Sequence, residues 1–185
     1  GTSNDGIGGL LTVTAKDIVF NTATVTTVGA VTLNADDDIT LNAGLNASAA
    51  SIAIHSNTVG ADASGFVQTA GIVRTTNGSA TAIEITVGGT GSAAIADVRA
   101  SSGTVSITAS GGAITDNLAG EAANISASKV ALTALSGIGT ADNINTAVTN
   151  LEAKTATGGI FIANTGAMTI GSVNGNLAGV DVTGA

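Results

Sequence analysis

The stretch Ala30–Gly44, with the sequence AVTLNADDDITLNAG, contains the pattern that decides the fold. The tetrapeptide Thr-Leu-Asn-Ala occurs at 32–35 and again at 40–43, with three aspartates between the two copies. In each copy apolar side chains alternate with polar ones, which is the two-residue period of a strand with one buried face. The interval between the copies fits a short strand followed by a tight turn.

Similar alternating runs recur along the whole chain, and each is bounded by Gly, Asn, Asp or Ser. Their apolar residues are largely β-branched, which favours strands over helices, and Gly and Asn supply residues suited to the turns between them. The runs are Leu11–Val13, Val31–Leu33, Ile39–Leu41, Ile52–Ile54, Ile83–Val87, Val105–Ile107, Val130–Leu132, Leu151–Ala153, Ile160–Ile162 and Met168–Ile170.

The runs also repeat over a longer interval. The run that begins at Val31 returns at Ile52, the run at Ile83 returns at Val105, and that at Val105 returns at Val130. A repeat of about 20–25 residues that contains several short strands is typical of one coil of a solenoid. Strands in such a fold pair with their equivalents in the next coil, roughly 4.8 Å away, so small aliphatic side chains can stack inward in columns.

We therefore predict an all-β fold, a right-handed parallel β-helix (β-solenoid) with coils of about 20–25 residues. We expect it to be one continuous segment over residues 1–185 that belongs to a longer chain or to a head-to-tail fibre. Solenoid coils contact only their neighbours, so stability accumulates coil by coil.

The segment 142–155, with the sequence DNINTAVTNLEAKT, fits two structures. Its apolar residues have helical spacing, but a strand would place Leu151 and Ala153 inward and Glu152 and Lys154 outward. We favour the strand because the next run, GGIFIAN, continues the ladder.

Composition excludes several classes of function. The chain has 5 Lys+Arg against 13 Asp+Glu, a formal net charge of −8, one His, and no Cys, Pro, Trp or Tyr. Disulfides and cysteine-based zinc sites are therefore excluded. Nucleic-acid binding is disfavoured because the acidic chain repels phosphates and offers no aromatic stacking platform. The sequence also lacks an apolar run of about 18 residues, so we expect no transmembrane segment.

The stretch from Ala141 to Gly171, ADNINTAVTNLEAKTATGGIFIANTGAMTIG, resembles a repeat of large bacterial surface proteins with β-strand repeats. These proteins are related to filamentous haemagglutinins and autotransporter-type adhesins. The runs AVTLNADDDITLNAG and GTVSITASGGAIT are similar in style to coils of the same proteins. The resemblance implies a right-handed parallel β-helix, export to the cell surface and a role in adhesion or a surface filament. It brings no catalytic residues.

The densest charge run is Asp36, Asp37 and Asp38. Hard cations such as Ca²⁺ require several carboxylate and carbonyl oxygens, so a calcium site is one interpretation. The other is a solvated turn between two strands, because Asp is a favourable turn residue. Consecutive side chains of a strand alternate faces, so only a tight loop would bring the three carboxylates together.

A polysaccharide-active β-helix enzyme would need acids from successive coils to converge in a groove. Arg74 and Arg99 are separated by about the length of one coil and could stack on adjacent coils. No spacing in the sequence pairs carboxylates for catalysis, so we predict that the chain is not an enzyme. The scattered acids that coiling could bring together are Asp97, Asp116, Glu121 and Asp181.

The sequence thus favours a structural or adhesive role as a stiff β-helical rod in a secreted or cell-surface filamentous bacterial protein. Its expected partners are further copies of itself, neighbouring coils of a parent chain, or a host or cell-surface glycan or protein. The expected location is extracellular or on the bacterial outer surface, and no cofactor other than calcium is considered. The alternative is a glycan- or protein-binding module on projecting loops, for which Ser56–Gly71 and Gly111–Glu121 are the candidates.

Overall fold

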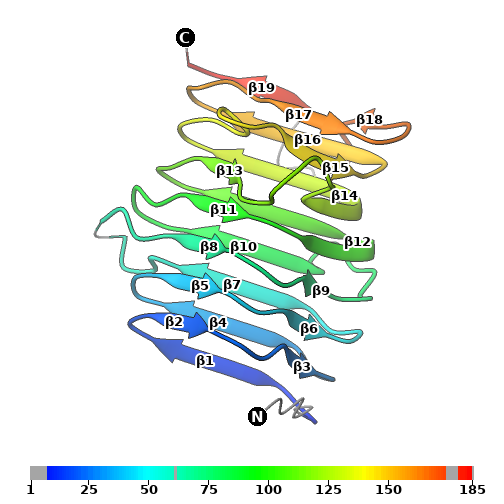
Figure 1. Cartoon of the computed structure of the whole chain (residues 1–185). Helices are drawn as coiled ribbons and strands as arrows, with labels where there is room; N and C mark the ends of the chain where they lie inside the picture. Colours follow the sequence, from blue (N-terminus) through cyan, green and yellow to red (C-terminus); the bar gives the residue numbers. More distant parts are fainter. Residues whose placement is uncertain (1–7, 61, 174–178, 185) are drawn as a thin grey trace.

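The structure is a computed structural model that describes residues 8–60, 62–173 and 179–184. In these ranges every regular element is a strand, and every strand pair is parallel. The strands lie in successive rungs, one above another along the rod (Figure 1). The predicted all-β parallel β-solenoid is therefore confirmed, with about 7 turns.

Each coil contributes strands to three stacks, which we call the first, second and third faces. The first face consists of β1 (Leu11–Ala15), β4 (Val31–Ala35), β7 (Ile52–Ser56), β10 (Ile83–Val87), the second parts of β12 (Val98–Ala109) and β14 (Ile125–Ala134), β16 (Asn150–Thr155), β18 (Thr169–Ile170) and β19 (Val180–Val182). The second face consists of β2 (Ile18–Phe20), β5 (Ile39–Leu41), β8 (Phe66–Gln68), β11 (Ala93–Ile95) and β13 (Ile114–Asp116), and it continues through bridges at Ile138 and Ile160. The third face consists of β3 (Val25–Thr27), β6 (Leu45–Ala47), β9 (Val73–Arg74), the first parts of β12 and β14, β15 (Ile144–Ala147) and β17 (Ile162–Asn164).

Inward side chains stack in columns of similar residues. On the first face Leu33 pairs with Ile54, Ile54 pairs with Ile85, and Ile85 pairs with Ile107. All four are at most 1% exposed. Full burial of one such side chain contributes about 1.5–3 kcal/mol, so a repeated column stabilises the rod along its whole length.

One coil is longer than the predicted length. Ile52 pairs with Ile83, so the coil that begins with β7 extends over 52–82 before the first face is reached again. The additional residues lie in two excursions, 57–65 between β7 and β8 and 75–82 between β9 and β10. Because both occur at corners between strands, the pairing register of the strands is unaffected.

The ambiguous segment 142–155 forms strands β15 and β16, as the sequence analysis favoured. Leu151 and Ala153 are buried as expected. Glu152, which we expected to face outward, is 1% exposed. The backbone N–H of Val173 donates a hydrogen bond of 3.0 Å to Glu152 Oε1, so this carboxylate contacts Val173 instead of solvent.

A buried glutamine joins two coils in the interior. Gln68 is fully buried at the end of β8 and lies beneath the corner between β11 and β12. Its Nε2 donates to the carbonyls of Gly71 (2.9 Å) and Asp97 (2.8 Å), and its Oε1 accepts from the N–H groups of Ala96 and Asp97, each at 3.1 Å. All four backbone groups are thereby satisfied without water, and the corner that carries Asp97 is fixed.

Candidate functional site

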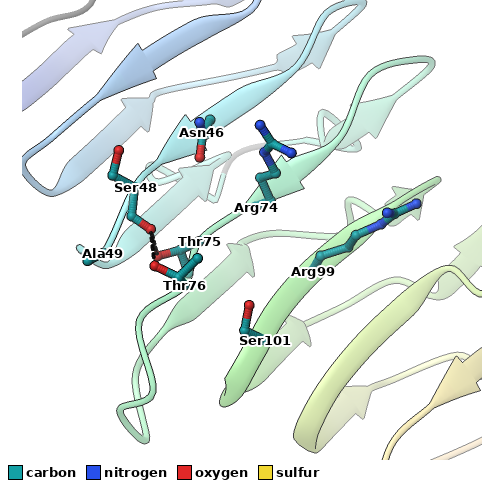
Figure 2. Close-up of a pocket in the computed structure, with 8 residues that line it drawn as sticks. All are labelled: Asn46, Ser48, Ala49, Arg74, Thr75, Thr76, Arg99 and Ser101. Atoms are coloured by element: carbon teal, nitrogen blue, oxygen red, sulfur yellow. Dashed lines mark hydrogen bonds between the residues drawn. The ribbon is translucent and has the colours of Figure 1, made fainter.

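A recess lies on the third face, where β6, β9 and β12 lie side by side (Figure 2). Its volume is about 550 Å³, within the range usual for small-molecule sites. Seven of its eight lining residues carry polar side chains, and none carries a carboxylate. The lining residues are Asn46, Ser48, Ala49, Arg74, Thr75, Thr76, Arg99 and Ser101.

Strand alternation places the two arginines of the recess on the outside of the rod. Arg74 follows buried Val73, and Arg99 lies between buried Val98 and Ala100. The register pairs Arg74 with Arg99, so the stacking that their spacing suggested is confirmed. Neighbouring strands of a sheet are about 4.8 Å apart, so the two side chains start from adjacent rungs.

The column of outward side chains continues to either side of the arginines. Asn46 pairs with Arg74 on one side, and Ser126 pairs with Arg99 on the other. A second hollow of about 330 Å³ shares Asn46 and Arg74 with the recess and extends toward β3. Arg74 therefore lies where the two hollows adjoin, and it is accessible from both.

Threonine hydroxyls hold one wall of the recess. Thr75 is 2% exposed, and its Oγ1 donates to the carbonyl of Ala50 (2.6 Å) and approaches that of Ser48 (3.1 Å). The neighbouring Thr76 Oγ1 donates to the same Ser48 carbonyl at 2.9 Å. These bonds tie the start of the 75–82 excursion to the turn after β6, so the long coil shapes the recess.

The two arginines differ in their charge environment. Asp97 binds Arg99 side-on: Nε donates to Oδ1 at 2.7 Å and Nη2 donates to Oδ2 at 2.6 Å. The hydrogen bonds that Arg99 donates to Asp97 raise the pKa of the Arg99 guanidinium above its ordinary value, so Arg99 stays protonated. Arg74 is exposed and forms no ion pair with any carboxylate in the described ranges. It is therefore the uncompensated cation of the site.

Three polar side chains of the recess are also without internal partners. The Asn46 amide and the hydroxyls of Ser48 and Ser101 make no hydrogen bond to other described residues. Each is at least partly exposed. The recess therefore presents a free guanidinium, an amide and two hydroxyls to solvent, which is chemistry suited to binding a polar, anionic group.

The aspartate run forms the corner between β4 and β5, as the turn interpretation expected. Asp37 accepts a hydrogen bond from Lys16, which raises the pKa of Lys16. The N–H of Gly65 donates to Asp38 Oδ1 at 2.7 Å, and Asp36 Oδ1 lies 3.4 Å from the Thr58 hydroxyl. The carboxylates thus serve three different partners, and the described residues contain no group of three or more His, Cys, Asp or Glu that could hold a metal ion. The calcium interpretation stays a prediction.

The four acids suggested for catalysis are bound to different partners. Asp97 is bound to Arg99, and Asp181 lies 4.0 Å from Lys154. Asp116 ends β13, and Glu121 follows in the segment that leads to β14. Asn124 donates to Asp116 (2.6 Å) and Asn145 donates to Glu121 (3.2 Å). These two carboxylates act as hydrogen-bond acceptors in a corner.

The projecting loops are shorter than the predicted ranges. Within Ser56–Gly71, β8 belongs to the second face, so the excursion is limited to 57–65. Within Gly111–Glu121, β13 likewise belongs to the rod. The excursion at 57–65 is organised by buried Asn57, whose Nδ2 donates to the carbonyls of Asp62, Ser64 and Gly88 at 2.9–3.2 Å.

Sequence reasoning identified the arginine stack but missed the polar residues around it. Asn46 pairs with Arg74 across a stretch of chain longer than the coil length that the repeat predicted. The signal that could have revealed this column is the spacing of outward-facing polar residues, if one coil is allowed to be longer than the others.

Comparisons with protein-family models, with curated proteins and with solved structures give no match to the chain. The described residues form no helix that is long and apolar enough to cross a bilayer.

Proposed function

We propose that the chain is a stiff β-helical rod in a secreted or cell-surface filamentous bacterial protein, where it acts in adhesion or in an extracellular fibre. The observation that carries the proposal is the parallel ladder that joins every coil to the next through columns of buried aliphatic side chains. A β-helical rod of this kind resists bending and holds its two ends a fixed distance apart. The resemblance of Ala141–Gly171 to β-strand repeats of large bacterial surface proteins supports the same role.

The surface of the rod fits this role. The formal net charge of −8 keeps parallel rods apart in solution and favours solubility.

Inward side chains are exposed at the last coil: Ile170 pairs with buried Leu151 but is 51% exposed, and Val180 pairs with buried Ala153 but is 49% exposed. Apolar columns and strand edges of this kind are suited to stacking against a further coil or a second copy.

The test is to locate the protein on its source cells and to measure its shape. An antibody against the chain should label intact cells, and immunogold electron microscopy should place the label on filaments. Diffraction from oriented filaments should show an axial repeat of about 4.8 Å. Label found only after cell lysis, or only on compact particles, would contradict the proposal.

A second candidate function is a binding module. The arginine recess on the third face favours it, because it combines a free cation with unpartnered polar side chains. The site lies on strands and a corner of the rod, and not on the projecting loops that the sequence suggests for a binding module.

A further inference from the structure

The recess on the third face has an excess of hydrogen-bond donors on an acidic protein. Of the five basic residues, Lys16, Arg99 and Lys154 lie within 4.0 Å of a carboxylate. Arg74 and Lys129 have no such partner among the described residues, although acids outnumber bases by 13 to 5 in the chain. Lys129 Nζ donates to the carbonyl of Ser172 at 3.0 Å, whereas no hydrogen bond from the Arg74 side chain to another described residue is found. A guanidinium that is left without a counter-ion in a hollow is suited to an anion from outside.

The geometry favours a carboxylate as that anion. Arginine presents a planar fork of N–H donors that matches the two oxygens of a carboxylate. Arg99, on the adjacent rung, already binds Asp97 in this side-on manner through Nε and Nη2. Asp97 neutralises the charge of Arg99. The Arg99 guanidinium therefore contributes mainly hydrogen-bond donors to the recess, through the N–H groups that do not bind Asp97.

The rest of the lining favours a saccharide as the carrier of the carboxylate. Asn46, Ser48 and Ser101 offer an amide and two hydroxyls without internal partners, and sugar hydroxyls need such donors and acceptors. The chain has no Trp or Tyr for stacking, so a neutral sugar would lack both an apolar platform and a charge. A nucleic acid is disfavoured because its many phosphates would meet a protein with a net charge of −8.

We propose that the third-face recess binds a carboxylate-bearing saccharide, with the carboxylate on Arg74 and the sugar hydroxyls on Asn46, Ser48 and Ser101. Arg99 supplies further donors, and the Asp97 and Gln68 contacts hold it in place. The proposal goes beyond the role of the chain as a rod. Since Arg74 is exposed, its guanidinium can be replaced without disturbing the core.

The experiment is calorimetric titration of the whole chain with a short oligogalacturonate and with the same oligosaccharide after methyl esterification of its carboxyls. The wild-type protein should bind the acid form, and binding should weaken as salt is added. Arg74→Gln should weaken binding roughly ten- to a hundredfold, the usual effect of losing a hydrogen-bonded charge pair. The control Lys154→Gln removes the same charge from the first face and should change affinity by no more than about twofold.

Several results would overturn the proposal. The first is no binding to the oligogalacturonate. The second is equal affinity for the acid and the esterified forms. The third is an equal loss of affinity in Arg74→Gln and Lys154→Gln. Sedimentation velocity without saccharide gives a further test, because self-association that is lost in Arg74→Gln would assign the recess to a carboxylate of a second copy. An unchanged circular dichroism spectrum and melting temperature of Arg74→Gln would show that the rod is intact, so a binding failure is distinguishable from a failure of the rod proposal.

Discussion

The replacement Gln68→Leu tests whether the buried amide of Gln68 holds the two coils together. Gln68 makes four hydrogen bonds to backbone groups, two as donor and two as acceptor. A hydrogen bond of this kind contributes a net value of about 1 kcal/mol, so the variant loses about 4 kcal/mol. Leucine is close to glutamine in size, and its greater apolar burial restores about 1 kcal/mol. The expected loss in the free energy of unfolding is therefore about 3 kcal/mol.

For a chain of this length a loss of about 3 kcal/mol lowers the melting temperature by roughly 6–12 °C. Thermal unfolding followed by circular dichroism measures this value. Hydrogen exchange of the Ala96 and Asp97 amides gives a local readout, because both N–H groups donate to Gln68 Oε1 and should exchange faster in the variant.

The matched control for this variant is Glu84→Leu, which places leucine at an exposed position of β10. A substitution there is expected to change stability by no more than about 0.5 kcal/mol. If Gln68→Leu matched the control in both melting temperature and amide exchange, the buried amide would not stabilise the corner, and the reasoning would be refuted.

Three further predictions concern the loops. Asn57 has φ = 51°, and its two amide N–H groups are shared among three carbonyl acceptors, so Asn57→Gly should cost about 2 kcal/mol. Asn57→Ala should cost about 1 kcal/mol more because alanine resists positive φ, and chemical denaturation of both variants checks the order. The backbone N–H of Ser64 lowers the pKa of Asp62 below 3.8, so its carboxylate stabilises the fold above that pH and the benefit is lost as pH falls through the lowered value. The melting temperatures of wild type and Asp62→Asn should therefore converge in acid, and a constant difference from pH 7 to about pH 2 would contradict this. Because Asp36–Asp38 serve separate partners, a calcium chelator should leave the melting temperature unchanged, whereas a drop on chelation that added Ca²⁺ reverses would establish a calcium site.

The strands and the arginine stack could be predicted from the sequence because they depend on local alternation and on a nearly constant coil length. Val105 pairs with Val130, and Arg74 pairs with Arg99, both as their separation in the sequence indicated. The long coil at 52–82 could not be predicted, since alternation does not tell how many residues leave the rod at a corner. The burial of Gln68 could not be predicted either, because its four hydrogen-bond partners are backbone groups of a turn and of the next coil.

The long coil connects the structural proposal to the binding proposal. Its 75–82 excursion leaves the rod directly after Arg74 and is tied back to the Ser48 carbonyl by Thr75 and Thr76. The inward columns continue through this coil without a change of register, so the core is not weakened by the insertion. Strand alternation then separates the two roles: Val73 stabilises the rod from inside, while Arg74, the next residue, faces the recess. Substitutions at outward positions of the third face should therefore alter binding without altering the rod, whereas substitutions at the inward positions should alter both.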